Sequence, residues 1–287
     1  MVSNVIISDE CLTTALLFYI IYILYLSKRG AFMSYHINEG LWAAIAPNVD
    51  VTVSTILYVV FFVAACAVGY LLGSINSAIL VSKALYGDDI RKHGSGNAGL
   101  TNMLRTFGLG AAGLTLLGDF LKTALSIFIA GVLFGFYYVA GVSTGAGMCY
   151  IAGMFAVIGH IAPAYYHFKG GKGVLSTAVM VAILAPIPFL FLITLFIIIV
   201  AISKYVSLGS VVSAILLPVI LSGYFTVVFE QGSTPGLAAL STIVIAILIV
   251  YCHRGNLQRI NNRTERKISF KKKEKTPAEE NDDASES

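Results

Sequence analysis

Residues 53–81 read VSTILYVVFFVAACAVGYLLGSINSAILV, a stretch without a charged side chain. A helix needs about 20 mostly apolar residues to cross the hydrocarbon core of a bilayer, and this stretch exceeds that length. It also carries Gly69, Gly73 and Ser74, small residues that allow a neighbouring helix to approach closely. We therefore predict a transmembrane helix that packs tightly against another one.

Apolar runs of this kind recur along most of the chain. Hydrophobic residues make up 57% of the sequence and charged residues only 12%, against about 25% charged in soluble domains. The remaining runs are 109–117, which is short, 121–140, 148–166, 174–202, 208–228 and 237–252. Pro186 and Pro188 divide the longest run, so we expect a break or a re-entrant turn there. The sequence predicts an all-α integral membrane protein, a compact bundle of about seven transmembrane helices.

Two segments flank this membrane domain, which we place at residues 51–267. Residues 1–50 form an N-terminal extension in which we predict one extra apolar helix, because the run 12–26 precedes Lys28 and Arg29. That run either crosses with its basic end outward or lies in the interface; basic residues after it disfavour a cleavable signal peptide. Residues 268–287 form a basic and then acidic tail that we expect to be disordered and cytoplasmic. Its basic part suits anionic lipid headgroups better than nucleic acid.

The basic residues predict the orientation, since Lys and Arg collect on the cytoplasmic side of a membrane. Here they fall at alternate ends of successive apolar runs and leave the opposite ends nearly bare. They are Lys83, Arg91, Lys92, Arg105, Lys122, Lys169, Lys172, Lys204 and the dense run within 254–275. We therefore expect the polar loops and the C-terminus to face the cytoplasm.

The first polar loop is too densely polar to serve helix packing alone. Its centre is 94–99, GSGNAG, and glycines let backbone N–H groups converge on an anion. Arg105 follows about two turns into a helix-like stretch and can offer its guanidinium to the same anion. The candidate phosphate-binding residues of this segment are Gly94, Ser95, Gly96, Asn97, Thr101, Asn102 and Arg105.

A second loop, residues 169–173, reads KGGKG and repeats this chemistry. Lys172 is flanked by glycines, so its ammonium can lie close to backbone N–H groups that also attract phosphate. Gly170, Gly171 and Gly173 are the candidate backbone donors beside it. The GxxxxGK[ST] spacing is missing, which disfavours nucleotide binding.

The last apolar run ends at a third polar segment. His253 and Asn256 lie there at the membrane face that carries the glycine loops. Ser207 and Ser210, after Lys204, open the preceding run, where the default role of a serine is to cap a helix.

Several other polar residues have a structural explanation. Asp119 and Lys122 are three positions apart and can form an ion pair on one helix face. His160 in an apolar helix is most simply a satisfied structural histidine. The cysteines stand singly in or beside apolar runs, so neither a metal site nor a redox pair is expected: they are Cys11, Cys66, Cys149 and Cys252.

Three segments, GSGNAGLTNMLRTFG, FKGGKGV and HRGNLQRI, occur in that order. They closely resemble the signature motifs of the bacterial membrane glycerol-3-phosphate acyltransferases that use acyl phosphate, the PlsY family. The resemblance covers about residues 56–267 and also includes GDFLKT and GHIAP. It departs from the family where Asn76 and Ala98 replace a frequent proline, Ala78 a common glycine and Gly255 a common glutamate. The first 50 residues exceed the usual start of the family.

The resemblance implies a compact seven-helix enzyme in the bacterial plasma membrane with its active site at the cytoplasmic face. It implies transfer of an acyl chain from acyl phosphate to the sn-1 hydroxyl of glycerol 3-phosphate, giving lysophosphatidic acid and phosphate. Neither a metal nor another cofactor is implied; membrane lipids and an enzyme that produces acyl phosphate are the implied partners. The catalytic positions carried over by motif are Ser95, Arg105, Lys172, His253 and Asn256, and either Ser207 or Ser210 helps to hold the substrate phosphate.

The residue types agree with this chemistry independently. An acyl phosphate has a good leaving group, so the protein mainly has to align two anionic substrates and stabilise developing negative charge. No Ser-His-Asp order is evident, so we expect direct transfer without an acyl-enzyme. The proton acceptor stays open among His253, which could equally be a cationic phosphate ligand, and the phosphate group of the substrate itself. A transporter of phosphorylated metabolites and a membrane scaffold are the alternatives. A transporter would usually need inverted repeats and charged groups near mid-membrane, and neither is evident in the sequence.

Overall fold

The computed structural model describes residues 40–41, 45–135, 144–228 and 236–268. Within these ranges the chain is helical and has no strand. The helices are α3 (Val51–Ser74), α4 (Ser77–Tyr86), α5 (Leu100–Phe134), α6 (Thr144–Ile161), α7 (Val174–Leu184), α8 (Pro186–Ser203), α9 (Val206–Val228), α10 (Gly236–Cys252) and α11 (Arg254–Asn261), with short 3-10 turns at Ala46–Asn48, Ile90–Lys92 and Ala164–Tyr166. The apolar run 12–26, Cys11 and the tail 269–287 lie outside the described residues.

The described part contains five helices long and apolar enough to cross a membrane, or six if α10 and α11 form one bent span. This makes the protein an all-helical membrane protein, but the count differs from the predicted seven. The run 109–117 and the part of the run 121–140 up to Phe134 belong to one helix, α5, because Gly118 and Asp119 do not interrupt it. Helix α7 has only 11 residues and is too short to span.

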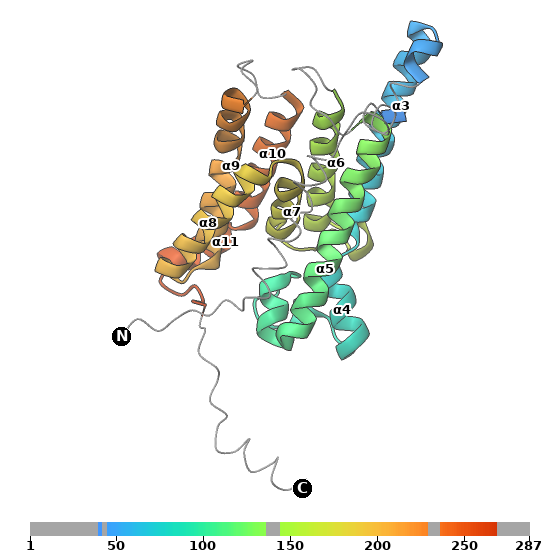
Figure 1. The fold of residues 1–287 in the computed structure, drawn as a ribbon. Helices are drawn as coiled ribbons and strands as arrows, with labels where there is room; N and C mark the ends of the chain where they lie inside the picture. Colours follow the sequence, from blue (N-terminus) through green and yellow to red (C-terminus); the bar gives the residue numbers. More distant parts are fainter. Residues whose placement is uncertain (1–39, 42–44, 136–143, 229–235, 269–287) are drawn as a thin grey trace, which may run out of the picture.

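Helices α3 and α6 lie side by side, and glycines allow their close approach (Figure 1). A side chain at Gly73 would collide with the backbone of Ala156, and one at Gly159 would collide with the backbone of Tyr70 and Ser74. The prediction that Gly69 and Gly73 serve tight packing is therefore confirmed.

The predicted helix 53–81 is broken, which the sequence analysis did not anticipate. Helix α3 ends at Ser74, and Asn76 begins α4 by accepting a hydrogen bond from the Ile79 N–H at 3.1 Å. An Asn at this position offers the backbone an alternative to the helical ladder, and so ends one helix and starts the next. The predicted break at Pro186 is confirmed, since α8 starts there after the non-helical Ala185.

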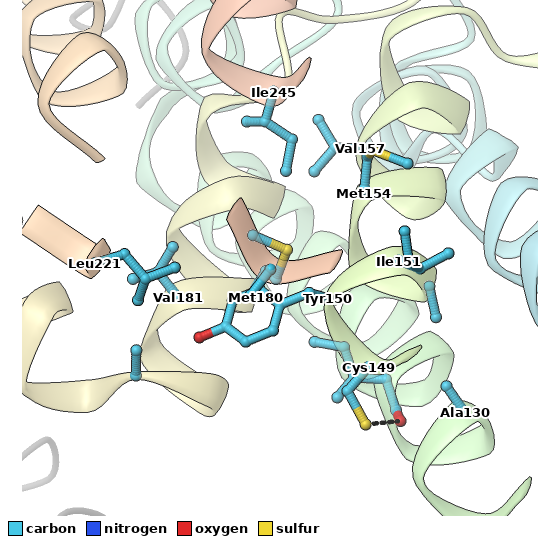
Figure 2. Close-up of a cluster of buried hydrophobic side chains, with 14 of the residues drawn as sticks. Ala130, Cys149, Tyr150, Ile151, Met154, Val157, Met180, Val181, Leu221 and Ile245 are labelled. Carbon is cyan, nitrogen blue, oxygen red and sulfur yellow. Dashed lines mark hydrogen bonds between the residues drawn. The ribbon is translucent and has the colours of Figure 1, made fainter. Parts of the chain in front are cut away.

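The largest apolar cluster of the described residues draws on α3 and on α5 to α10. Tyr150, Met180, Leu221 and Ile245 meet there and are at most 1% exposed (Figure 2). Cys66 and Cys149 are buried free thiols in the same cluster, and Cys252 is a half-buried free thiol. Cys66 and Cys149 thus pack as small hydrophobes, as predicted, whereas Cys252 does not belong to the cluster.

Candidate active site

A cavity of about 590 Å³ opens among the polar loops and the helices α5 and α7 to α11. All five predicted catalytic residues line it: Ser95, Arg105, Lys172, His253 and Asn256. Its wall also includes Gly94, Asn97, Thr101, Asn102, Gly173, Ser207 and Ser210 from the predicted binding set. Residues from segments up to about 160 positions apart are thus brought to one site.

The loop 94–99 is organised by the side chain of Asn102. The two N–H bonds of its amide nitrogen are shared among the carbonyls of Ile90, His93 and Asn97, at 3.3, 3.0 and 3.1 Å, and its oxygen accepts from the Ser95 N–H at 2.9 Å. Asn102 is 2% exposed, so we interpret it as the residue that builds the loop. Its residue type predicts a substrate ligand, yet these bonds use both ends of its amide.

Two glycines allow this loop to fold. Gly94 and Gly96 have φ angles of 59° and 73°, a region that favours glycine. A side chain at Gly94 would also collide with the Asn102 oxygen. Gly96 lies outside the main cavity and lines a neighbouring hollow of about 550 Å³ that shares Lys172 and Asn256 with it.

The loop 169–173 differs from the prediction in its backbone donors. The N–H groups of Gly170 and Gly171 donate to the carbonyls of Ile161 and His160, at 3.2 and 3.0 Å, and neither glycine lines the cavity. They therefore satisfy the C-terminal carbonyls of α6, which lack partners within that helix. The expectation that these two N–H groups bind phosphate is not met in this geometry, whereas Gly173 and Lys172 do line the cavity.

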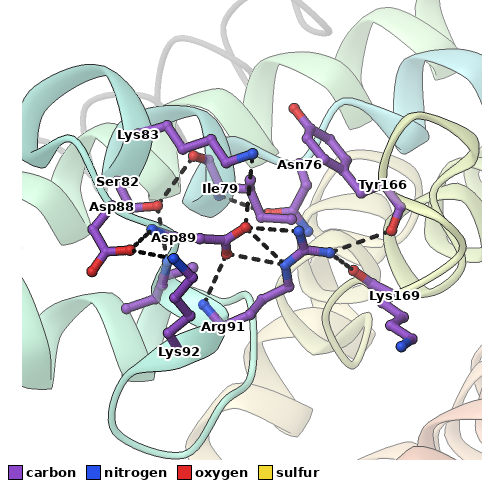
Figure 3. A network of polar contacts seen from close by, with 11 residues as sticks. Asn76, Ile79, Ser82, Lys83, Asp88, Asp89, Arg91, Lys92, Tyr166 and Lys169 are labelled. Carbon is purple, nitrogen blue, oxygen red and sulfur yellow. Dashed lines mark hydrogen bonds and ion pairs between the residues drawn. The ribbon is translucent and has the colours of Figure 1, made fainter.

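Arg91, just before the first glycine loop, contacts the segment that carries the second one. Arg91 donates to the carbonyls of Tyr166 and Lys169 at 3.3 and 3.1 Å, and its guanidinium is paired with Asp89 at 2.7 Å (Figure 3). The segment before the first loop therefore supports the segment that carries Lys172.

Lys172 belongs to a chain of hydrogen bonds that crosses the site. Its ammonium donates to the Asn256 oxygen at 2.5 Å, and the Asn256 amide nitrogen donates to Glu265 at 2.6 Å. Glu265 also accepts from the Ser207 hydroxyl at 2.9 Å and from the Arg259 Nε at 2.7 Å. The Glu265 carboxylate thus orients the Asn256 side chain so that the amide oxygen of Asn256 faces Lys172.

The same contacts set the charge of both groups. Burial raises the pKa of Glu265, but hydrogen bonds from Asn256, Arg259 and Ser207 outweigh it and hold the pKa below its usual value. Burial lowers the pKa of Lys172, while the Glu265 carboxylate opposes that shift and Arg259 adds to it. Lys172 is therefore a partly desolvated cation that depends on Glu265 for charge compensation.

His253 lies at the junction of α10 and α11 and is 3% exposed. Its Nδ1 is 2.7 Å from the carbonyl oxygen of Ile249. A carbonyl can only accept, so Nδ1 carries a proton and Nε2 is the nitrogen that titrates.

The two predicted serines lie inside α9 and do not cap it. The helix begins at Val206, and the Ser210 hydroxyl donates to the Val206 carbonyl at 3.0 Å while Ser207 donates to Glu265. The default capping role is therefore wrong, and both serines contribute to the cavity wall.

Five charged or titratable lining residues, Arg266 among them, were absent from the predicted site. Asp119 and His160 were assigned structural roles, although an ionisable group inside a membrane span is a functional signal by default. Arg259 and Glu265 lie in the basic C-terminal segment. No pattern in the sequence distinguishes Glu265 there. Its place in the site comes from the fold, since a turn with Arg263 at φ 57° brings Glu265 back to α11, where its N–H donates to the Arg259 carbonyl.

A family model described as glycerol-3-phosphate acyltransferase matches residues 63–263. The chain belongs to this family. A glycerol-3-phosphate acyltransferase of Syntrophomonas wolfei is 41% identical over 203 residues, which cover 70% of this chain and 94% of the relative. One of Alkaliphilus metalliredigens is 38% identical over 202 residues, covering 70% of this chain and 93% of the relative. The resemblance drawn from the three motifs is thus confirmed.

Solved structures agree with the family match. The glycerol 3-phosphate form of PlsY, an integral membrane glycerol 3-phosphate acyltransferase, has a TM-score of 0.62 and 31% identity, covering 72% of this chain and 96% of that one. The lysophosphatidic acid form has a TM-score of 0.60 and 30% identity, with coverage of 72% and 95%. This glycerol-3-phosphate acyltransferase is therefore an enzyme, and the transporter and scaffold alternatives are set aside.

Proposed function

We propose that this acyltransferase moves an acyl group from acyl phosphate to the sn-1 hydroxyl of glycerol 3-phosphate, releasing lysophosphatidic acid and phosphate. The observation that carries the proposal is the composition of the cavity. Cationic and polar side chains gather at the loop end, around Lys172, Arg105 and Arg259, while the remainder is apolar. Such a cavity suits a ligand with a phosphate at one end and a hydrocarbon chain at the other.

The apolar part of the cavity lies among α7, α8, α9 and α10. Its wall includes Val181, Phe189, Leu192, Phe196 and Leu217. An apolar wall of this kind suits the hydrocarbon chain of the donor. The two forms of PlsY in the solved structures, with glycerol 3-phosphate and lysophosphatidic acid, support the same pair of ligands here.

The proposed reaction needs little covalent participation by the protein. The sn-1 oxygen forms a bond to the acyl carbonyl carbon, and the bond from that carbon to the phosphate oxygen breaks, so phosphate leaves with the electron pair. Lys172 and Arg105 stabilise the negative charge on the phosphates and on the tetrahedral oxyanion. Ser95 adds a hydroxyl donor, whereas the Ser207 hydroxyl donates to Glu265. The hydroxyl proton goes either to His253 Nε2 or to a phosphate oxygen of the substrate.

The placement in the cell follows from the same proposal. We infer that residues 51–267 form the catalytic domain in a bacterial plasma membrane, with the loops at the cytoplasmic face where glycerol 3-phosphate is available. An enzyme that makes acyl phosphate would supply the donor.

The direct test follows phosphate release from palmitoyl phosphate by the purified protein, with and without glycerol 3-phosphate. We expect release that needs both substrates and yields lysophosphatidic acid, with acyl-CoA inactive as a donor. Activity with acyl-CoA alone would overturn the donor assignment. A folded preparation without turnover on either donor would overturn the proposed reaction.

Replacing Glu265 with glutamine should move the alkaline limb of the pH profile of kcat/KM to lower pH. The groups that face Lys172 are Glu265, Arg259, Cys252 and His253. Of these, Glu265 is the acid that stabilises the ammonium, so its removal lowers the pKa of Lys172 and the charge is lost sooner as pH rises. Asp88→Asn is the control, since Asp88 is a half-exposed acid outside the cavity that pairs with Lys92 and His93. Equal alkaline limbs in wild type and E265Q would contradict the role of Glu265.

A further inference from the structure

Three buried ionisable side chains lie between the two glycine loops and are unused by the reaction proposed above. Asp119, Lys122 and His160 are 1%, 5% and 3% exposed. Asp119 and Lys122 belong to α5, and His160 lies near the end of α6. Buried charges in a membrane span are costly, so their presence needs a gain elsewhere.

The ammonium of Lys122 has one ion-pair partner and two hydrogen-bond acceptors. Its Nζ forms an ion pair with Asp119 at 2.8 Å and lies 2.9 Å from the carbonyl oxygen of Ile75 and 2.9 Å from His160 Nδ1. His160 Nδ1 is 3.6 Å from the Asp119 carboxylate, too far for a hydrogen bond. His160 therefore accepts from Lys122 and is neutral, with its proton on Nε2.

Two of the three partners of Lys122, Ile75 and His160, belong to structures that support a glycine loop. Ile75 lies in the break between α3 and α4, and the next residue, Asn76, donates to the Ala98 carbonyl of the first loop at 3.5 Å. The His160 carbonyl accepts the Gly171 N–H of the second loop. A side chain at Gly171 would collide with the His160 ring and with the Ala98 carbonyl, so the loop packs directly on the imidazole.

We propose that Lys122, Asp119 and His160 form a positioning network that holds both glycine loops, and through them Lys172, in the arrangement needed for acyl transfer. The inference rests on the proposed function. The network joins a helix break to two loops, and errors of about 1 Å in the position of catalytic groups cost about 100-fold in rate. Asp119 serves as the counter-charge, and His160 is the contact with the loop.

The test separates positioning from folding by replacing the ion pair as a unit. Lys122→Met alone leaves a buried unpaired carboxylate and should destabilise the protein strongly. The double variant D119L/K122M replaces both charges by apolar groups of similar size, a change that often preserves stability. We expect it to melt near the wild-type temperature but to show kcat/KM for glycerol 3-phosphate about 10- to 100-fold lower. A stable double variant with wild-type kcat/KM would overturn the proposal.

If the double variant aggregates, His160→Asn and His160→Leu test the positioning network instead. Asparagine at position 160 can place an oxygen acceptor near the site of Nδ1, whereas leucine cannot. His160→Asn should therefore be about tenfold more active than His160→Leu at equal amounts of folded protein. Equal activity of the two would overturn the proposal. The wild-type assay comes first, because an inactive wild type would contradict the proposed function instead of the network.

Discussion

Replacing Lys172 with alanine is expected to lower kcat/KM for acyl transfer by about 100- to 1,000-fold, the usual cost of one preorganised electrostatic group. Its ammonium is partly desolvated and is held by Asn256, which in turn is fixed by Glu265. Such a cation stabilises the charge that develops on phosphate without first reorganising. Phosphate release from acyl phosphate at varied glycerol 3-phosphate measures the loss.

Lys169→Ala is the matched control for this variant. Lys169 belongs to the same loop and has the same charge, but its side chain is exposed and lies outside the cavity. It should retain nearly wild-type kcat/KM, since an exposed charge contributes little. Similar losses in both variants would show that the loop acts through its total charge, and the specific role of Lys172 would be wrong.

Replacing Gly73 with leucine is expected to destabilise the fold by at least about 3 kcal/mol. Even a single carbon at this position would overlap the backbone of Ala156, so α3 and α6 would have to move apart. Thermal melting of the purified protein, with size-exclusion chromatography as a check on aggregation, measures the effect.

Gly113→Leu supplies the comparison for the glycine variant. Gly113 is an exposed residue of α5 with no other group within 4 Å of an added carbon. Leucine there should raise stability slightly, because it removes a glycine from a helix. A melting temperature of G73L equal to that of G113L would contradict the close helix contact.

The sequence pointed to the candidate site because polar residues are conspicuous in so apolar a chain. Ser95, Arg105, Lys172, His253 and Asn256 were found in this way, and they share one cavity. The break at Pro186 was predictable for a different reason, since proline lacks an N–H group. The break at Asn76 was missed because a single asparagine within an apolar run carries a much weaker signal.

The sequence could not separate residues that bind a ligand from those that build the loop. Asn102, Gly170 and Gly171 have the residue types of phosphate ligands, yet their hydrogen bonds go to the protein backbone. Glu265 was missed for the opposite reason, since an acid within a basic segment does not suggest an anion site. Only the fold shows that its carboxylate meets Asn256 and Arg259.

The spacing of Asp119 and Lys122 bears on how α5 enters the membrane during synthesis. Each charge alone costs about 2.5–3.5 kcal/mol at the centre of a helix during insertion. The two residues are three positions apart on one helix and form their ion pair without help from another segment. The nascent α5 can therefore enter the bilayer as a neutral unit, before α6 is present to add His160. The ion pair of Asp119 and Lys122 thus lowers the free-energy cost of inserting α5 into the membrane.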